Sequence, residues 1–229
     1  MKQPTDVRAL AERIGLGGVF SESSLAQMEL VRYAHGERLC SIGDRLDGMF
    51  ILASGKLKVY TLLPNGKAML VRFARPPALI GDVEFMERYP VKNNVESSGE
   101  SLVLRTGRAA LTNEMRDNPA FMEYMVRQLS YKLYTFGNAS ALNVLYPLEN
   151  RFASYLASFL ADDEGDKYAE EIRAATLTEM ADMLGTSYRH LNRVIRRFEN
   201  EGLIARKRGR LTVLDEDKIR SLAKGQWYE

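Results

Sequence analysis

The sequence has a single cysteine, Cys40, and only two histidines, His35 and His190, among 229 residues. One cysteine cannot form an intramolecular disulfide, and it excludes an iron–sulfur cluster held by four cysteines. Two distant histidines do not supply the His and Cys clusters that haem or a mononuclear metal needs, so no metal site is expected. A lone thiol is more often a small buried apolar residue than a redox switch. A reducing cytoplasm is the expected location.

Long apolar runs are also missing. No segment approaches the roughly 20 apolar residues of a membrane span, and residues 1–8 lack the apolar core of a signal peptide. No glycine-rich phosphate loop, nucleophile elbow or Cys/His pairing is present, and a cupin-like enzyme would need a metal cluster. Neither a membrane partner nor an enzyme is therefore expected. The hydrophobic share of 45% is instead that of a globular protein of one or two domains.

A short helix is predicted to begin near residue 176. Thr176 and Glu179 have the spacing of a capping box. One apolar face follows at i, i+3 and i+4 spacing, with Met180, Met183 and Leu184. The next residue, Gly185, can take the positive φ that a sharp turn needs, so the helix should end there.

A second short helix should follow this turn, because Thr186 or Ser187 can cap it. Its apolar positions fall on the inward face, at Leu191, Val194, Ile195 and Phe198. Its polar positions fall on the outward face, at Tyr188, Arg189, Asn192, Arg193 and Arg196. Two short helices joined by a glycine turn, the second with donors outward, form a helix-turn-helix.

Charge is uneven around this motif, although the whole chain carries only +2. Residues 187–210 hold eight arginines and lysines against two glutamates, whereas residues 162–182 hold eight acidic against two basic side chains. Basic patches bind phosphate backbones by releasing counterions. A solvated helix face is the simpler interpretation, but cap, turn, apolar stripe and charge together favour DNA binding.

The segment Thr176–Val213 resembles the C-terminal DNA-binding part of the CRP/FNR family of bacterial transcription regulators, and Ser187–Leu191 is especially similar to its YeiL-type branch. In this family, an Arg-Glu-x-x-x-Arg pattern after the capping serine reads bases. Here only the last arginine, Arg193, is kept, and its guanidinium can bond guanine O6 and N7 together. The base-reading side chains expected from this resemblance and from side-chain reach are Arg193, Arg189, Asn192 and Tyr188.

A basic hairpin after the second helix is expected to form a wing, with strands beginning near Leu203 and Leu211. Its cations should contact phosphates rather than bases. The expected contacts to the DNA backbone are Thr176, Thr186, Ser187, Arg196, Arg206, Lys207 and Arg208. The acidic segment 162–171 lies where CRP-like activators meet RNA polymerase, so the resemblance implies that partner for an activator; a solvated loop is the simpler interpretation.

Residues about 32 to 112 are predicted to form a β domain, because short apolar alternations are separated by turn signals at even spacing. Met49–Leu52 is a candidate for a buried strand, and Asn65-Gly66 predicts a hairpin turn. Several turn glycines align with those of the double-stranded β-roll in CRP-like sensor domains, namely Gly43, Gly55, Gly66 and Gly81. The resemblance therefore covers nearly the whole chain.

The sensor pocket departs from the family pattern for cyclic AMP. Family members that bind cyclic AMP hold its ribose with Gly-Glu-Leu, its phosphate with Arg-Ser and its adenine with Thr-Ser. The corresponding positions here are Gly81, Asp82 and Val83, then Lys92, Asn93 and Asn94, then Phe136 and Gly137. Lysine lacks the bidentate fork of arginine, and Phe136 supplies no hydroxyl. Cyclic AMP is therefore not expected, and the pocket is either filled by Phe136 and its neighbours or takes a different small-molecule effector.

One long helix is predicted from Pro119 to Leu145, with Asn118 as its cap. It carries an a/d seam suited to a short coiled coil, made of Met122, Val126, Leu129, Leu133 and Phe136. In the CRP/FNR family this helix forms the dimer interface, so the resemblance implies a homodimer. The alternative is a helix that packs this stripe on its own β-roll. Both can hold, since Tyr124, Met125 and Tyr131 supply a second apolar side. Tyr146-Pro147 then interrupts the helix and marks a hinge.

These patterns predict an α+β protein in three parts: a β-roll sensor with N-terminal helices (1–117), a dimerisation helix and hinge (118–146) and a winged helix-turn-helix (147–229). The N-terminal helices are expected over Asp6–Ile14 and from Ser21 through Val31. The predicted function is sequence-specific transcription regulation by a dimer on a near-palindromic operator. The alternative is a ligand-binding signalling module whose winged helix contacts protein, for which DNA binding would depend little on salt.

Overall fold

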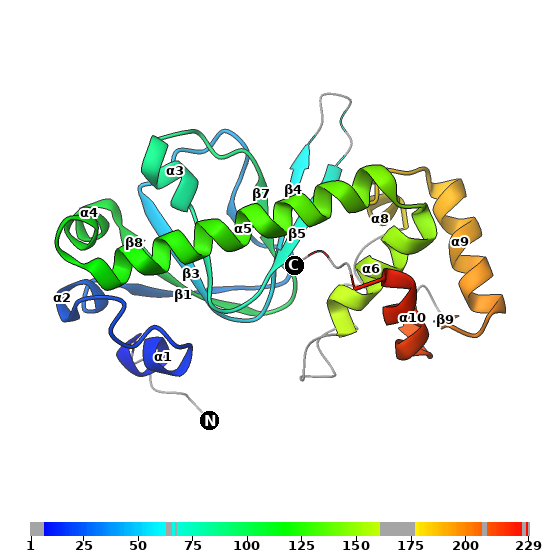
Figure 1. The fold of residues 1–229 in the computed structure, drawn as a ribbon, viewed down its shortest axis with the longest axis horizontal. Helices are drawn as coiled ribbons and strands as arrows, with labels where there is room; N and C mark the ends of the chain where they lie inside the picture. The colour runs from blue at the N-terminus through cyan, green and yellow to red at the C-terminus, as the bar shows by residue number, and fades with distance from the viewer. Residues whose placement is uncertain are drawn as a thin grey trace. The chain divides into compact units, whose positions relative to one another are not determined.

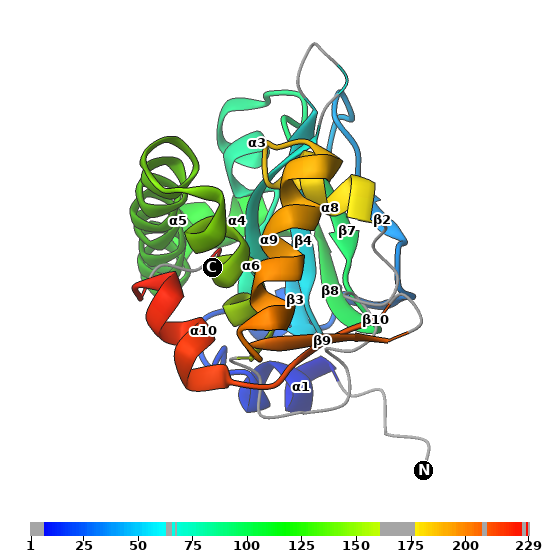
Figure 2. The same cartoon turned by 90° about the vertical axis from the view of Figure 1, so that its right-hand side faces the viewer.

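The computed structural model describes residues 7–62, 66, 68–160, 177–207, 210–225 and 228 (Figures 1 and 2). Predictions on residues outside this set concern Asn65, the acidic segment 162–171, Thr176 and Arg208, and the side chain of Lys207 also lies outside it. The chain forms two compact units. One contains residues 1–58 and 74–134, and the other contains residues 59–73 and 135–229.

The first unit begins with two short helices, α1 (Val7–Arg13) and α2 (Glu22–Leu25). Ser21 caps α2, since its hydroxyl accepts a hydrogen bond of 3.3 Å from the backbone amide of Ser24. The predicted continuation of this helix through Val31 is wrong, because β1 (Glu29–Tyr33) occupies that stretch. All five residues of β1 pair with β8, so strand pairing overrides the local helix signal.

Two four-stranded sheets form the β domain. The first has the order β1-β8-β3-β6 and adds β3 (Gly48–Ser54), β6 (Ala78–Ile80) and β8 (Ser101–Gly107) to β1. The second has the order β2-β7-β4-β5 and consists of β2 (Arg38–Cys40), β7 (Asn94–Ser97), β4 (Leu57–Leu62) and β5 (Ala68–Ala74). Ile51 of β3 lies opposite Leu79 on one side and Leu104 on the other, and all three are fully buried. The predicted strand at Met49–Leu52 is therefore confirmed.

The helix α3 (Asp82–Glu87) lies between β6 and β7 in the chain, and α4 (Arg108–Asp117) and α5 (Pro119–Leu145) follow β8. The bounds of α5 are those predicted. Asn118 caps it, because its Oδ1 accepts from the backbone amides of Ala120 and Phe121 at 3.1 and 3.2 Å. One side of α5 packs into the core of this unit, where the Phe121 ring lies 5.2 Å from that of Phe20.

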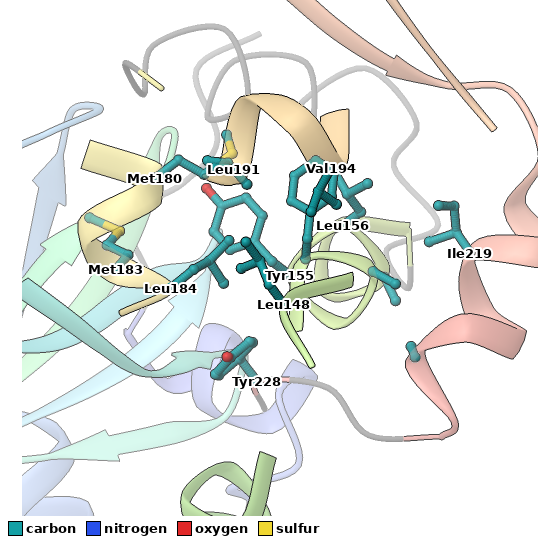
Figure 3. Packing of buried hydrophobic residues seen from close by; sticks show 14 of the residues in the cluster. Leu148, Tyr155, Leu156, Met180, Met183, Leu184, Leu191, Val194, Ile219 and Tyr228 are labelled. Carbon is teal, nitrogen blue, oxygen red and sulfur yellow. The ribbon is translucent and has the colours of Figure 1, made fainter. Parts of the chain in front are cut away.

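The second unit contains the helix-turn-helix and the wing. Its elements are α6 (Leu148–Leu160), α8 (Leu177–Met183), α9 (Tyr188–Asn200), β9 (Ile204–Lys207), β10 (Arg210–Val213) and α10 (Glu216–Ala223). Side chains of α6, among them Tyr155 and Leu156, point into one cluster with side chains of α8 and α9 (Figure 3). The β4–β5 hairpin also belongs to this unit, and the ring of Phe73 lies 4.8 Å from that of Phe159.

Tyr228, for which the sequence suggested no role, is fully buried in the second unit. Its amide donates to Ser158 Oγ at 3.0 Å, its hydroxyl donates to Asn143 Oδ1 at 2.8 Å, and its carbonyl accepts from the amide of Phe73 at 2.6 Å. Burial raises the pKa of this hydroxyl above its ordinary value. Tyr228 thus joins α6, the end of α5 and β5 within one core.

Candidate nucleic-acid interface

The turn between α8 and α9 is built as predicted. Gly185 has a φ of +61°, a conformation that other residues rarely adopt. Ser187 caps α9, because its Oγ accepts a hydrogen bond of 3.2 Å from the amide of His190. Arg151 of α6 donates to the carbonyl oxygen of Leu184, directly after α8, a contact that local sequence patterns do not reveal. The left-handed glycine and these two hydrogen bonds together define the turn from which α9 begins.

The apolar face of α9 is buried within its own unit. The predicted inward residues are each at most 3% exposed, namely Leu191, Val194, Ile195 and Phe198. The Phe198 ring lies 5.4 Å from that of Phe152 on α6. Figure 3 shows Leu191 and Val194 directed toward Tyr155 and Leu156 of α6. Because this face is fully packed, α9 is held with its opposite face outward.

The outward face of α9 presents the predicted base-reading side chains. Arg189 and Arg193 are exposed, Tyr188 is 47% exposed and Asn192 is half-buried. Arg196 is also exposed on this helix. A row of donors on an exposed helix face is the arrangement by which recognition helices contact base edges in the major groove.

Not every cation of this basic stretch belongs to that face. Arg197 donates to Glu201 at 2.7 Å and lies 3.8 Å from Glu149 of α6. Its charge is therefore compensated within the domain, although the total charge of residues 187–210 counts it.

Among the predicted phosphate contacts at the turn, Ser187 is exposed and Thr186 is half-buried.

The predicted wing is confirmed as an antiparallel hairpin of β9 and β10, with Arg206 opposite Leu211. Figure 2 shows this hairpin beside one end of α9. Arg206 was predicted to contact phosphate, but its guanidinium donates to Asn192 Oδ1 at 3.1 Å and lies 3.7 Å from a carboxylate oxygen of Glu199. Sequence patterns gave no sign of this contact, because its partners are 14 residues apart on different elements.

The predicted sensor residues divide into buried and exposed groups. Gly81 has a φ of +90°, and Asp82 after it is 1% exposed at the start of α3. Asn94 is 2% exposed and accepts from the amide of Ile42 at 3.0 Å. Asn93 is half-buried, whereas Val83 and Lys92 are exposed. Phe136 is 58% exposed, and its filling of the pocket stays a prediction.

Lys132 of α5 is the partner of the buried carboxylate. Its ammonium forms an ion pair with Asp82 Oδ1, and the side chains are 19% and 2% exposed. Asp82 Oδ2 and Asn94 Nδ2 are buried and have no hydrogen-bond partner among the described residues. The a/d pattern of α5 drew attention to its apolar residues only, and Lys132 was therefore missed.

The predicted a/d seam of α5 is largely uncovered. Val126, Leu133 and Phe136 are 58%, 74% and 58% exposed, and Met122 and Leu129 are half-buried. The side of α5 that packs on its own domain instead carries three other residues, namely Phe121, Tyr124 and Met125. The alternative that the seam itself packs on the β-roll is therefore wrong for these exposed residues.

Cys40 is buried, at 4% exposed. Burial, together with the neighbouring carboxylates of Glu84 and Asp44, raises the pKa of its thiol to about 12. A thiol protonated at neutral pH is a poor nucleophile, which argues against a redox switch. Within the described residues, no group of three or more His, Cys, Asp or Glu side chains could hold a metal, and no helix there is long and apolar enough to cross a membrane.

Two known domain families match this chain in tandem. The cyclic nucleotide-binding domain matches residues 30–118, and the Crp-like helix-turn-helix domain matches residues 150–222. The chain is 26% identical over 198 residues to the regulatory protein YeiL of Escherichia coli, covering 86% of this chain and 87% of that protein. It is 23% identical over 196 residues to a CRP-like cAMP-activated global transcriptional regulator of Mycobacterium tuberculosis, covering 84% and 87%.

The fold is also found among solved structures. A CRP-family transcriptional regulator from Thermus thermophilus aligns with a TM-score of 0.69 at 22% identity, covering 87% of this chain and 98% of that one. The two matched domains lie in the same order as the β domain and the helix-turn-helix of the structure, and α5 lies between them in the chain. The chain belongs to the CRP/FNR family, and it is a DNA-binding transcription regulator.

Proposed function

We propose that this regulator binds a near-palindromic operator as a homodimer, with α9 of each copy in the major groove. The observation that carries the proposal is the division of α9 into a fully buried apolar face and an exposed face of donors. Arg193 is assigned to a guanine, since a guanidinium bonds O6 and N7 together. Arg189 and Asn192 reach neighbouring base edges, and Tyr188 contacts a phosphate or a thymine methyl group.

The DNA backbone is contacted by groups around α9. Ser187 and Thr186 stand at the start of α9, where amides and hydroxyls suit phosphate. Thr176, which lies outside the described residues, is proposed as a further phosphate contact. Arg196, Lys207 and Arg208 add charge, which positions the protein but carries no sequence information. The acidic segment 162–171 is proposed to meet RNA polymerase where the protein acts as an activator.

Dimerisation is proposed through the exposed seam of α5. Leu133 and Phe136 lie open to water within the described chain, together with Val126. Contiguous exposed apolar surface marks an interaction site, and the a/d spacing of these residues suits a second copy of the same helix. Two-fold symmetry then places the two α9 helices one turn of DNA apart, about 34 Å.

The sensor domain is proposed not to respond to cyclic AMP. Asp82, which stands where cyclic AMP-binding members hold the ribose, is already paired with Lys132 and is almost wholly buried. The side chains at the phosphate position are Lys92, Asn93 and Asn94, without arginine. A relative from Mycobacterium tuberculosis is described as a cAMP-activated regulator. The residues at the ribose and phosphate positions argue against activation of this protein by cyclic AMP. An effector of another class would meet the unpartnered polar atoms of Asp82 and Asn94.

Selection of binders from random DNA duplexes, with purified protein and no added ligand, tests this function. We expect an enriched inverted repeat, and added cyclic AMP should not change it. Salt-sensitive binding without any enriched sequence would contradict operator recognition by the effector-free protein. DNA binding that hardly depends on salt would favour the alternative of a winged helix that contacts protein.

A further inference from the structure

Arg206 lies on the strand that faces the recognition helix. It follows the buried Ile204 by two residues on β9, so both side chains leave the same side of the strand. Its guanidinium donates to Asn192 Oδ1 at 3.1 Å, and its Nε lies 3.7 Å from Glu199 Oε1. Asn192 and Glu199 are seven residues apart on α9 and therefore share one face of the helix. The side chains of Arg206 and Glu199 are only 29% and 26% exposed.

This contact determines which way the amide of Asn192 points. A guanidinium has only donors, so the atom of Asn192 that faces Arg206 must be the carbonyl oxygen. The NH2 group is then directed away from Arg206. A freely rotating asparagine could turn either its carbonyl oxygen or its NH2 group toward a base. An asparagine whose amide is fixed by a hydrogen bond presents its donor and acceptor in one arrangement only. Because bases differ in that arrangement along the major groove, the orientation of the amide affects which base is preferred.

We propose that Arg206 is a positioning residue for base recognition, which fixes the amide of Asn192 and thereby sets the base preference at one operator position. This inference rests on the proposed placement of α9 in the major groove. The nearby carboxylate of Glu199 offsets the charge of Arg206. Arg206 therefore contributes through Asn192 rather than through the DNA backbone.

Arg206→Met tests this proposal, because methionine keeps an unbranched apolar stem but has no donor. Selection from random duplexes is repeated with wild type, Arg206→Met, Asn192→Ala and the double variant. We expect Arg206→Met and Asn192→Ala to lose preference at the same base pair, with a fall of about tenfold in discrimination there. The double variant should lose no more than either single variant, since both remove one contact.

Arg196→Met provides the matched control, because Arg196 is an exposed arginine of α9 assigned to phosphate. This variant should weaken binding to all duplexes equally and reduce the magnitude of the slope of log K against log salt by about 0.9. Arg206→Met should leave that slope unchanged. If Arg206→Met keeps the wild-type base preference and reduces the slope as the control does, Arg206 is a phosphate contact and the proposal is overturned. Circular dichroism of each variant establishes that the domain is folded.

A second measurement uses the free protein and does not depend on any operator. The side-chain amide signals of Asn192 in a proton–nitrogen NMR spectrum should shift in Arg206→Met and stay in place in Arg196→Met. Unchanged Asn192 signals in Arg206→Met would overturn the proposal even if wild type enriches an operator. Shifted signals together with no enriched operator would support the positioning contact and count against the proposed function alone.

Discussion

The two helices α5 and α9 both carry apolar residues at helical spacing, but only α9 buries all of them within its own unit. In α9, Leu191 and Ile195 are fully buried while Arg193 between them faces outward. In α5, Tyr124 and Met125 are buried on one side, whereas Leu133 on another side is 74% exposed. An apolar stripe therefore predicts which face of a helix avoids water, but it does not identify what covers that face.

The comparison assigns different tasks to the two helices. The buried stripe of α9 holds a polar face outward toward DNA, and the open stripe of α5 is left for a second copy of the chain. Substitutions in the two stripes should therefore have different consequences. A change in α5 should affect association, and a change in α9 should affect folding of the DNA-binding unit.

The largest effect is expected for Leu133→Asn in the seam of α5. Burying one leucine side chain stabilises by about 1.5–3 kcal/mol, and a two-fold interface counts it twice, so dimer association should weaken by about 3–6 kcal/mol. The stability of the monomer should change little, because the residue is exposed there. Sedimentation equilibrium measures the association constant, and urea unfolding at low protein concentration measures the stability.

Leu145→Asn is the matched control for that experiment. Leu145 is also 74% exposed on α5 but lies outside the a/d positions. It should leave dimerisation nearly unchanged. If both variants weaken dimer association equally, the seam is not the interface. The exposed stripe of α5 would then no longer be explained by a second copy of the chain.

A somewhat smaller effect is expected for Phe198→Ala on the buried face of α9. Phe198 is 1% exposed against Phe152, and truncation of such a side chain costs about 3–5 kcal/mol. Urea unfolding should show this loss. Tyr188→Ala on the opposite face of the same helix serves as control and should stay within about 0.5 kcal/mol of wild type. Similar losses for both would contradict the division of α9 into two faces.

The smallest effect is expected for Arg193→Ala, which leaves the fold intact. Loss of a bidentate guanine contact should cost about 1–3 kcal/mol of operator affinity and relax one base position. Fluorescence anisotropy with the selected operator and with a random duplex measures both affinities. An equal loss on the two duplexes would assign Arg193 to the phosphate backbone instead.

Local signals in the sequence account for much of this structure. The bounds of α5 and the inward residues of α9 follow from caps, proline and apolar spacing, and both were predicted. The cap of α9 was predicted at Thr186 or Ser187, and the structure identifies Ser187. The strand β1 was predicted as helix, because its identity depends on pairing with β8 more than 65 residues later. Local propensity carries no information about such a partner.

The same limit applies to the candidate sites. The outward donors of α9 could be named from helical spacing alone, although their base contacts stay predictions. The pairs Asp82–Lys132 and Asn192–Arg206 could not, because each joins two elements that only the fold brings together. In both pairs, a residue singled out from the sequence is engaged by a charged partner that was either missed or given another role.

The mass of the complex on the selected operator tests the central claim most directly. Light scattering of the protein–DNA complex, with a duplex that carries the inverted repeat and with a duplex that carries one half-site, gives the number of chains bound. We predict two chains on the inverted repeat for wild type, and markedly weaker assembly for Leu133→Asn. One chain on the full repeat, with Leu133→Asn binding as wild type does, would contradict a dimer that presents two copies of α9 to successive major grooves.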